Sequence, residues 1–148
     1  MALAVCCDLR IAGAGARFAI PAAKLGLGYG FVGIKRLVDI VGVAFAKEIF
    51  LTARMFDAEE ARDMGLVNRV VPDDEVAPYV ADYAGRIAAN APLTVMAIKA
   101  VANETVKDAA DRDLEACQAW VDRCFASRDY VEGRRAFMEK RKPVFTGS

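Results

Sequence analysis

The sequence contains no histidine. Imidazole is the side chain that most often serves as a general base near neutral pH, and it activates serine and cysteine nucleophiles, so Ser-His-Asp and Cys-His pairs are excluded within this chain. Zinc sites of the usual histidine and cysteine types are also disfavoured. Any acid–base chemistry in these residues must therefore use a carboxylate, lysine, tyrosine, cysteine or water.

Net charge and long apolar runs are also missing. The 20 Lys and Arg residues balance the 20 Asp and Glu residues, so no net field would attract nucleic acid or an anionic membrane. No apolar run approaches the ~18 residues that a membrane-spanning helix needs. The apolar start, Met1–Cys7, lacks the basic flank of a signal peptide. We expect neither nucleic acid nor a membrane as a partner.

The four cysteines show no CxxC pair. Cys6 and Cys7 are adjacent and cannot readily bridge each other, and Cys117 and Cys124 are spaced to share one apolar helix face. This usage favours reduced, buried thiols in a cytoplasmic protein.

What the sequence does contain is apolar side chains. Its 148 residues suit one domain, and 55% of them are hydrophobic, which exceeds the average for a soluble domain. A rich core explains this surplus, and so does apolar surface that meets partner subunits or a further segment.

Short strands are predicted at the start of the chain and once in its middle. Leu3–Ala12 and Arg17–Ile20 could pair as neighbouring strands across the flexible connection Gly13–Ala16, and Leu66–Val71 is predicted as a third strand. Two or three short strands do not make a comfortable independent sheet. We therefore expect sheet partners outside this chain, upstream or on another subunit.

Helical patterns dominate the rest. Leu25–Gly30 is predicted as a tight loop, and helices are expected over Phe31–Val41, ended by Gly42, and over Ala44–Thr52. Asp57 is spaced from Glu60 as the N-cap of a further helix that stops at Gly65. Later helical patterns follow Pro72 and Pro92, with a break at Arg128–Asp129 and an amphipathic segment over 130–142. The fold class is α/β, in an α+β-like arrangement with strands first.

Six segments, taken in order and at their spacing, resemble the C-terminal portion of the enoyl-CoA hydratase/isomerase (crotonase) family. They are Leu3–Ala12, Phe18–Pro21 with Leu25–Leu27, Gly33–Leu37, Met64–Val71, Ala91–Pro92 with Lys99, and Glu132–Pro143. The resemblance covers the whole chain.

The resemblance implies part of a core of ββα units over residues 1–90 and a helical region over 91–148 that trimerises and contacts coenzyme A. It implies a lyase of fatty acid metabolism that acts on acyl-CoA thioesters as a trimer or hexamer, with coenzyme A as part of the substrate and no separate cofactor or metal. Family members stabilise a thioester enolate with two main-chain N–H groups. By the resemblance both groups precede Met1, so this chain alone is predicted to be inactive as a hydratase.

The chain departs from the hydratase pattern at the positions that handle water. The two glutamates of family hydratases would align with Ala2 and Ala22, and Gly30 stands where some relatives carry an aspartate. Alanine and glycine cannot transfer a proton, so the pattern does not favour two-glutamate hydration.

Tyr29 and its surroundings are locally similar to methylmalonyl-CoA decarboxylases, which the resemblance implies place a tyrosine in the active site. A phenol could orient a leaving carboxylate or donate a proton, or Tyr29 could simply pack in its loop. Gly26 and Gly28 are expected to line the acyl pocket. Phe137 and Lys140 resemble positions near the coenzyme A nucleotide of a neighbouring subunit, and a solvated helix end is the alternative.

Two functions remain open. The first is an acyl-CoA enzyme, either a hydratase-like lyase or a decarboxylase-like one. The second is a truncated, non-catalytic paralogue that serves as an oligomerisation or coenzyme A-binding module. Asp8, Asp129 and Glu132 are interpreted as structural, and Trp120 as a core or subunit contact.

Overall fold

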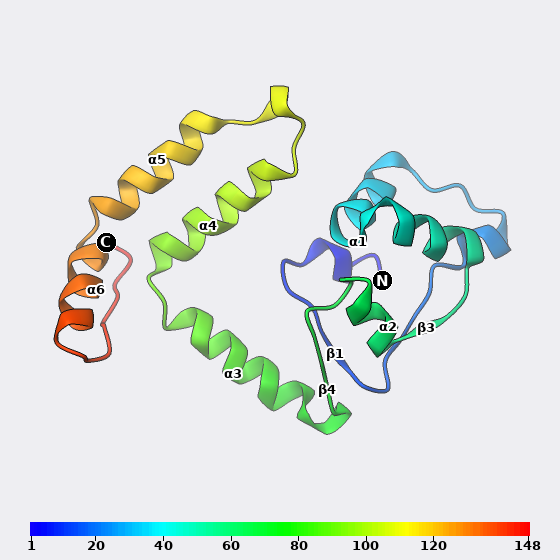
Figure 1. Ribbon diagram of the computed structural model, residues 1–148, viewed down its shortest axis with the longest axis horizontal. Coiled ribbons are helices and arrows are strands. Elements are labelled where there is room, and N and C mark those ends of the chain that lie inside the picture. The colour runs from blue at the N-terminus through cyan, green and yellow to red at the C-terminus, as the bar shows by residue number, and fades with distance from the viewer. The chain divides into compact units, whose positions relative to one another are not determined.

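The computed structural model describes all 148 residues, which divide into two compact units, Met1–Ala81 (unit 1) and Asp82–Ser148 (unit 2). Its helices and strands confirm the α/β class (Figure 1). The elements in chain order are η1 (Ala4–Cys6), β1 (Ile11–Gly13), β2 (Arg17–Phe18), η2 (Pro21–Leu25), α1 (Phe31–Thr52), β3 (Phe56–Asp57), α2 (Ala58–Asp63), β4 (Arg69–Val71), η3 (Asp73–Glu75), α3 (Val76–Ala88), α4 (Pro92–Thr105), η4 (Ala109–Asp111), α5 (Leu114–Phe125) and α6 (Arg128–Met138). The division falls after Ala81, and the roles expected for residues 1–90 and 91–148 remain predictions.

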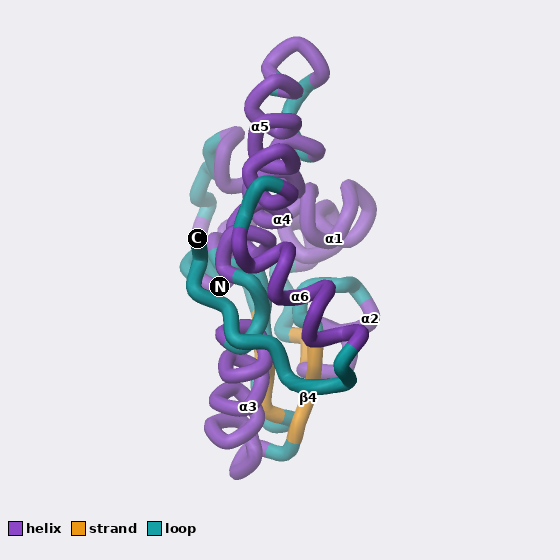
Figure 2. Tube along the Cα trace, turned by 90° about the vertical axis from the view of Figure 1, so that its left-hand side faces the viewer, coloured by secondary structure: helices purple, strands orange, loops and turns teal.

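Unit 1 contains two separate two-stranded pairs. β1 runs parallel to β4 with Ala12 opposite Val70, and β2 runs antiparallel to β3 with Phe18 opposite Phe56. Figure 2 shows the strands in orange, with β4 labelled. The expected pairing of Leu3–Ala12 with Arg17–Ile20 is therefore wrong. The predicted first strand is also too long, because Ala4–Cys6 forms a 3-10 turn.

Asp73, the first residue of η3, explains where the connection between β1 and β2 goes. Its carboxylate accepts a hydrogen bond from the main-chain N–H of Gly15 at 3.0 Å. A Cβ atom added at Gly13 would lie 2.1 Å from Asp73 Oδ1. Because Gly13 and Gly15 have no side chains, the Asp73 carboxylate fits against them. It therefore holds the turn after β1 close to the segment that follows β4, rather than to β2.

Helix α1 is broken at Gly42, as the sequence predicted. Gly42 has φ 75° and ψ 165°, which a residue with a Cβ rarely adopts. Both halves of α1 contribute to the apolar core of unit 1, where the largest fully buried side chains are Leu37, Ile49, Phe56 and Leu66.

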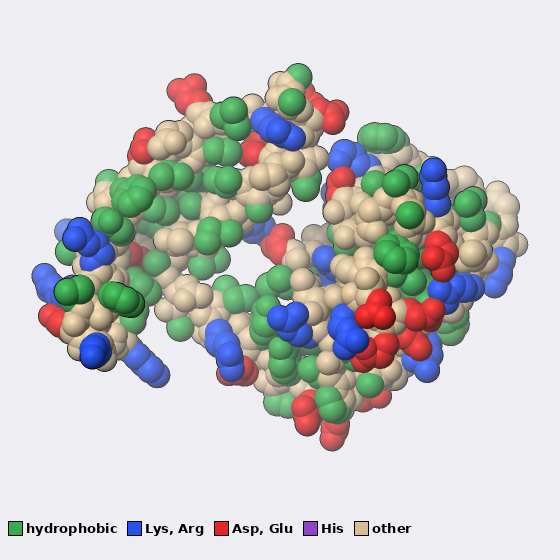
Figure 3. Space-filling model, in the orientation of Figure 1, with side chains coloured by type: hydrophobic (Ala, Val, Ile, Leu, Met, Phe, Trp, Pro, Cys, Tyr) green, Lys and Arg blue, Asp and Glu red, His purple; other side chains and the backbone are tan.

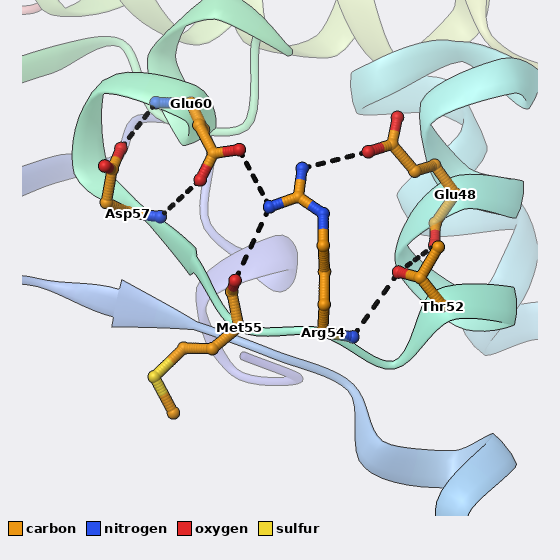
Figure 4. Close-up of polar contacts among 6 residues, drawn as sticks. All are labelled: Glu48, Thr52, Arg54, Met55, Asp57 and Glu60. Carbon is orange, nitrogen blue, oxygen red and sulfur yellow. Dashed lines mark hydrogen bonds and ion pairs between the residues drawn. The ribbon is translucent and has the colours of Figure 1, made fainter.

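Arg54 connects the end of α1 to the start of α2. Its guanidinium lies 2.9 Å from Glu48 and 2.7 Å from Glu60, and these contacts raise its pKa (Figure 4). Glu60 also accepts from the Asp57 N–H while Asp57 accepts from the Glu60 N–H. The predicted N-cap is thus confirmed as a reciprocal capping box, and Glu60 serves both the cap and the ion pair.

Unit 2 buries much less. Neither α3 nor α5 contains a buried residue, and the buried apolar side chains of the unit are Leu93, Ala97 and Ala136. In the space-filling view hydrophobic side chains gather over α4 and α5 (Figure 3). The break expected at Arg128–Asp129 lies two positions earlier, at Ala126–Ser127, because Ser127 caps α6 by accepting from the Tyr130 N–H at 3.0 Å.

None of the helices combines the length and the apolar character needed to cross a membrane.

Candidate functional site

The glycine-rich loop of unit 1 joins η2 to α1 and contains three of the predicted site residues, Gly26, Gly28 and Tyr29. Gly26 ends η2 in the left-handed conformation, with φ 63°, and the N–H of the next residue, Leu27, donates to Ala22 O at 3.0 Å. Added Cβ atoms at Gly26 and Gly28 would meet nothing within 4 Å. The loop is therefore open on its outer side, and only Gly26 is required there by its backbone conformation.

Tyr29 lies against α1 and keeps part of its surface open. Its ring contacts Phe50 edge-on with centroids 4.9 Å apart, and a Cβ at Gly33 would lie 3.2 Å from the same ring. The residue is 40% exposed. Tyr29 thus packs in its loop, as one of the two sequence interpretations predicted, and the residue stays partly exposed. A catalytic role stays a prediction.

The break at Gly42 makes this contact geometrically feasible. A straight helix rises about 1.5 Å per residue, so it would carry Phe50 about 30 Å away from Tyr29. With the break, the second half of α1 returns toward the loop, and Phe50 reaches the ring. Gly33 and Phe50 were missed by sequence reasoning because nothing in their spacing links them to Tyr29.

The positions aligned with the hydratase glutamates carry no functional group. Ala22 is 5% exposed within η2, and Ala2 is exposed ahead of η1. Close to Ala2, the Sγ atom of Cys6 lies 2.9 Å from the Arg36 guanidinium and 3.3 Å from Ala2 O. Neither alanine position can activate a water molecule.

The remaining predicted site residues, Phe137 and Lys140, belong to unit 2. Phe137 is 82% exposed near the end of α6. Lys140 is exposed and has φ 53°, the left-handed conformation that ends the helix. An exposed ring and an exposed ammonium group fit contact with a planar, anionic ligand, and no contact in the structure assigns them that role.

Arg141, the next residue, forms ion pairs with two carboxylates. Its guanidinium pairs with Glu132 at 2.6 Å and with Glu139 at 2.6 Å, which raises its pKa. The Arg141 hydrogen bond lowers the pKa of Glu132 to about 2, helped by the Val144 N–H, which donates to Glu132 Oε1. Because both its partners are carboxylates, Arg141 is less suited than Lys140 to a phosphate.

The comparison with family models matches Enoyl-CoA hydratase/isomerase over residues 1–148. The chain belongs to the enoyl-CoA hydratase/isomerase (crotonase) family. Crotonyl-CoA hydratase of Syntrophomonas wolfei is 43% identical over 143 residues, which are 97% of this chain and 55% of that protein. Short-chain-enoyl-CoA hydratase of Clostridium acetobutylicum is 37% identical over 95% of this chain and 54% of its own length. The chain thus spans about half the length of these curated relatives.

A relative of similar extent and the solved structures agree with this assignment. Short-chain-enoyl-CoA hydratase of Clostridioides difficile is 37% identical over 91% of this chain and 87% of its own length. The crystal structure of enoyl-CoA hydratase from Mycobacterium tuberculosis H37Rv superimposes with a TM-score of 0.87 at 33% identity, covering 99% of this chain and 58% of that one. The fold is therefore that of the family, over roughly half of its extent.

Proposed function

We propose that these residues form the acyl-binding and assembly part of an enzyme that acts on acyl-CoA thioesters through a stabilised enolate. Family membership supports the thioester substrate, since the relatives named above are crotonyl-CoA and short-chain enoyl-CoA hydratases. Gly26, Gly28 and Tyr29 line the acyl end, and Phe137 and Lys140 contact the coenzyme A nucleotide of a neighbouring subunit.

The finer proposal is decarboxylation rather than hydration, and the observation that carries it is the loop beside Ala22. Hydration adds water across a double bond, so a base must take a proton from water and an acid must return one to the α-carbon. Ala2 and Ala22 supply neither, whereas the loop offers an accessible phenol at Tyr29.

Decarboxylation requires less of the side chains. The carboxylate leaves as CO2, the electron pair of its bond to the α-carbon passes into the thioester enolate, and a proton then returns to that carbon. Main-chain N–H donors can stabilise the enolate oxygen by several kcal/mol. Tyr29 would orient the carboxylate or supply the proton through its hydroxyl, while Phe50 and Gly33 fix its ring.

A chimera tests this proposal. The part of Syntrophomonas wolfei crotonyl-CoA hydratase that precedes the matched region is joined to Met1 of this chain. We expect CO2 release from methylmalonyl-CoA and no crotonyl-CoA hydration above a buffer control. Tyr29→Phe keeps the ring and should lower decarboxylation by about a hundredfold. Tyr83→Phe, in α3 and outside the groove of α4, α5 and α6, is the matched control and should leave decarboxylation unchanged. Crotonyl-CoA hydration well above the buffer control would contradict the proposal.

The second candidate is a non-catalytic assembly module, and the exposed helices of unit 2 favour it. A groove of about 710 Å3 among α4, α5 and α6 is lined by apolar side chains, including Ile98, Val101 and Phe125. We propose that further copies of the chain cover such surface in a trimer or hexamer. If the chimera assembles and turns over neither thioester, the module is the better description. A clean monomer in light scattering at micromolar concentration would count against the assembly.

A further inference from the structure

Arg36, in the first half of α1, has a guanidinium whose neighbour is a thiol rather than a carboxylate. The residue is exposed, and its guanidinium lies 2.9 Å from the Sγ atom of Cys6. A thiol is a weak acceptor, and it takes up one of the several N–H donors of a guanidinium. The preceding residue, Lys35, pairs instead with the Asp39 carboxylate at 2.9 Å. Arg36 therefore keeps donors and charge for an anionic ligand.

Arg36 also lies one turn of α1 beyond the residue that supports Tyr29. A Cβ atom at Gly33 would lie 3.2 Å from the Tyr29 ring. Residues three apart on a helix share a face, with their Cβ positions about 5–6 Å from each other. Gly33 and Arg36 are such a pair. The phenol of Tyr29 and the guanidinium of Arg36 therefore belong to adjacent turns of one helix face.

The surroundings of this face favour a negative charge. The Sγ atom of Cys6 lies 3.3 Å from Ala2 O, so the Arg36 guanidinium reaches the residue ahead of η1, and Ala2 has no polar side chain that would compete for it. The first turn of α1 contains no acidic residue, and its N-cap is Gly30. The N-terminal end of a helix carries partial positive charge, which adds to that of a nearby cation. A carboxylate at this face would thus be stabilised by Arg36 first and by the helix second.

We propose that Arg36 binds the carboxylate of a malonyl-type substrate, in which that group is attached to the α-carbon of a coenzyme A thioester. The inference rests on the proposed function for the thioester and for Tyr29, and it divides two roles between them. Arg36 recognises the carboxylate. The group then leaves as CO2, and the electron pair of its bond passes into the enolate. The Tyr29 hydroxyl supplies the proton that the α-carbon takes up, and the phenolate regains a proton from water.

This division predicts which kinetic constant each residue sets. A guanidinium that pairs with a carboxylate stabilises the bound substrate, and the pairing is lost as the group becomes neutral CO2. Such an interaction favours the carboxylated thioester over the uncarboxylated one without speeding the breaking of the bond. Arg36 therefore sets KM and substrate choice, whereas Tyr29 sets kcat. A purely structural role for Arg36 would not separate the two constants in this way.

The chimera with the Syntrophomonas wolfei segment tests the assignment. Arg36→Met removes the charge and keeps an unbranched side chain. We expect KM for methylmalonyl-CoA to rise at least about tenfold, as for the loss of one hydrogen bond between charged groups, with kcat within about twofold. Inhibition by propionyl-CoA, the same thioester without the carboxylate, should be unchanged. Arg17→Met is the matched control and should leave KM unchanged, because the exposed Arg17 guanidinium donates to main-chain oxygens of its own turn.

Arg36→Lys covers the case in which Arg36→Met does not fold. It keeps the charge and loses the forked geometry, so its KM should lie between those of the unmodified chimera and Arg36→Met. An unchanged KM in every Arg36 variant that folds would overturn the inference. A loss of propionyl-CoA inhibition as large as the rise in KM would also overturn it, because the effect would then not depend on the carboxylate.

Failure of the inference and failure of the proposed function give different results. CO2 release with the same KM in Arg36→Met leaves the decarboxylation standing and removes Arg36 from it. If the chimera releases no CO2, the decarboxylation fails, and calorimetric titration then measures the affinities for the two thioesters. A preference for methylmalonyl-CoA over propionyl-CoA that Arg36→Met abolishes would support the carboxylate site on its own. Equal affinities for the two thioesters would overturn it as well.

Discussion

Unit 1 and unit 2 are each stabilised internally by a different kind of contact. Unit 1 has an apolar core in which Leu37, Ile49, Phe56 and Leu66 are almost completely covered. Unit 2 buries two polar residues, Ser127 and Asp129, alongside only three apolar ones. Hydrogen bonds from Thr146 and Gly147 to Asp129 hold the C-terminal tail of unit 2 against α6. Unit 1 therefore carries its own hydrophobic stabilisation, whereas unit 2 leaves many of its apolar side chains exposed.

The largest effect should come from the core of unit 1. Phe56 is buried and its ring stacks on Phe18 with centroids 5.7 Å apart. Phe56→Ala leaves a cavity and should lower the free energy of unfolding of unit 1 by about 3–5 kcal/mol. Circular dichroism in urea measures this loss.

The control for this variant is the neighbouring residue. Met55 is 66% exposed, so Met55→Ala should change stability by less than about 0.5 kcal/mol. The fluorescence of the single tryptophan, Trp120 in α5, reports on unit 2 and should keep its midpoint in both variants. Equal losses in the two variants would mean that the burial of Phe56 does not stabilise unit 1.

The next largest effect should come from Asp129 in unit 2. This carboxylate is 3% exposed and accepts from the main-chain N–H groups of Thr146 and Gly147, each at 2.8 Å. Asp129→Ala removes these two hydrogen bonds, and a longer one from Thr146 Oγ1 at 3.4 Å, and should cost about 2 kcal/mol. Urea unfolding followed by Trp120 fluorescence measures the loss, and hydrogen exchange at residues 144–148 should quicken.

Asp82 provides the matched comparison for that variant. Its carboxylate pairs with Arg86 on an exposed face of α3. Asp82→Ala should therefore cost about 0.5 kcal/mol or less. A loss as large as that of Asp129→Ala would show that burial does not distinguish the two carboxylates.

Local signals in the sequence predicted local structure well. The capping box of Asp57 and Glu60, the break at Gly42 and the helix start at Pro92 are confirmed, because each depends on backbone preferences within a few residues. The interpretation of Asp129 as structural agrees with its bonds to the tail. Its partners lie 17 and 18 residues away and carried no signal of their own.

Long-range contacts were the part that the sequence could not specify. β1 pairs with β4, 58 residues on, because Asp73 enters the space left by Gly13 and Gly15. Likewise the sequence indicated Tyr29 as a candidate, and only the fold places Phe50 against it. Both contacts depend on three-dimensional packing rather than on a repeating pattern.

The smallest effect should be the pH dependence of the tail ion pair in unit 2. The pKa of Glu132 falls from 4.5 to about 2 in the folded protein, chiefly because Arg141 hydrogen-bonds to it, with Val144 N–H and Arg135 assisting. Between these values the unfolded chain binds more protons than the folded one, so the stability that Glu132 contributes is complete above pH 4.5 and disappears as pH falls toward 2.

Glu132→Gln removes this contribution to stability. The urea midpoint of Trp120 fluorescence should therefore be lower in Glu132→Gln than in the unmodified protein at neutral pH, and the two should converge in acid. Glu139→Gln removes the other carboxylate that pairs with Arg141 and leaves the Glu132–Val144 hydrogen bond in place. It should therefore lower the urea midpoint at neutral pH less than Glu132→Gln does. A difference between Glu132→Gln and the unmodified protein that persists unchanged near pH 2 would show that Glu132 does not fasten the tail through its charge.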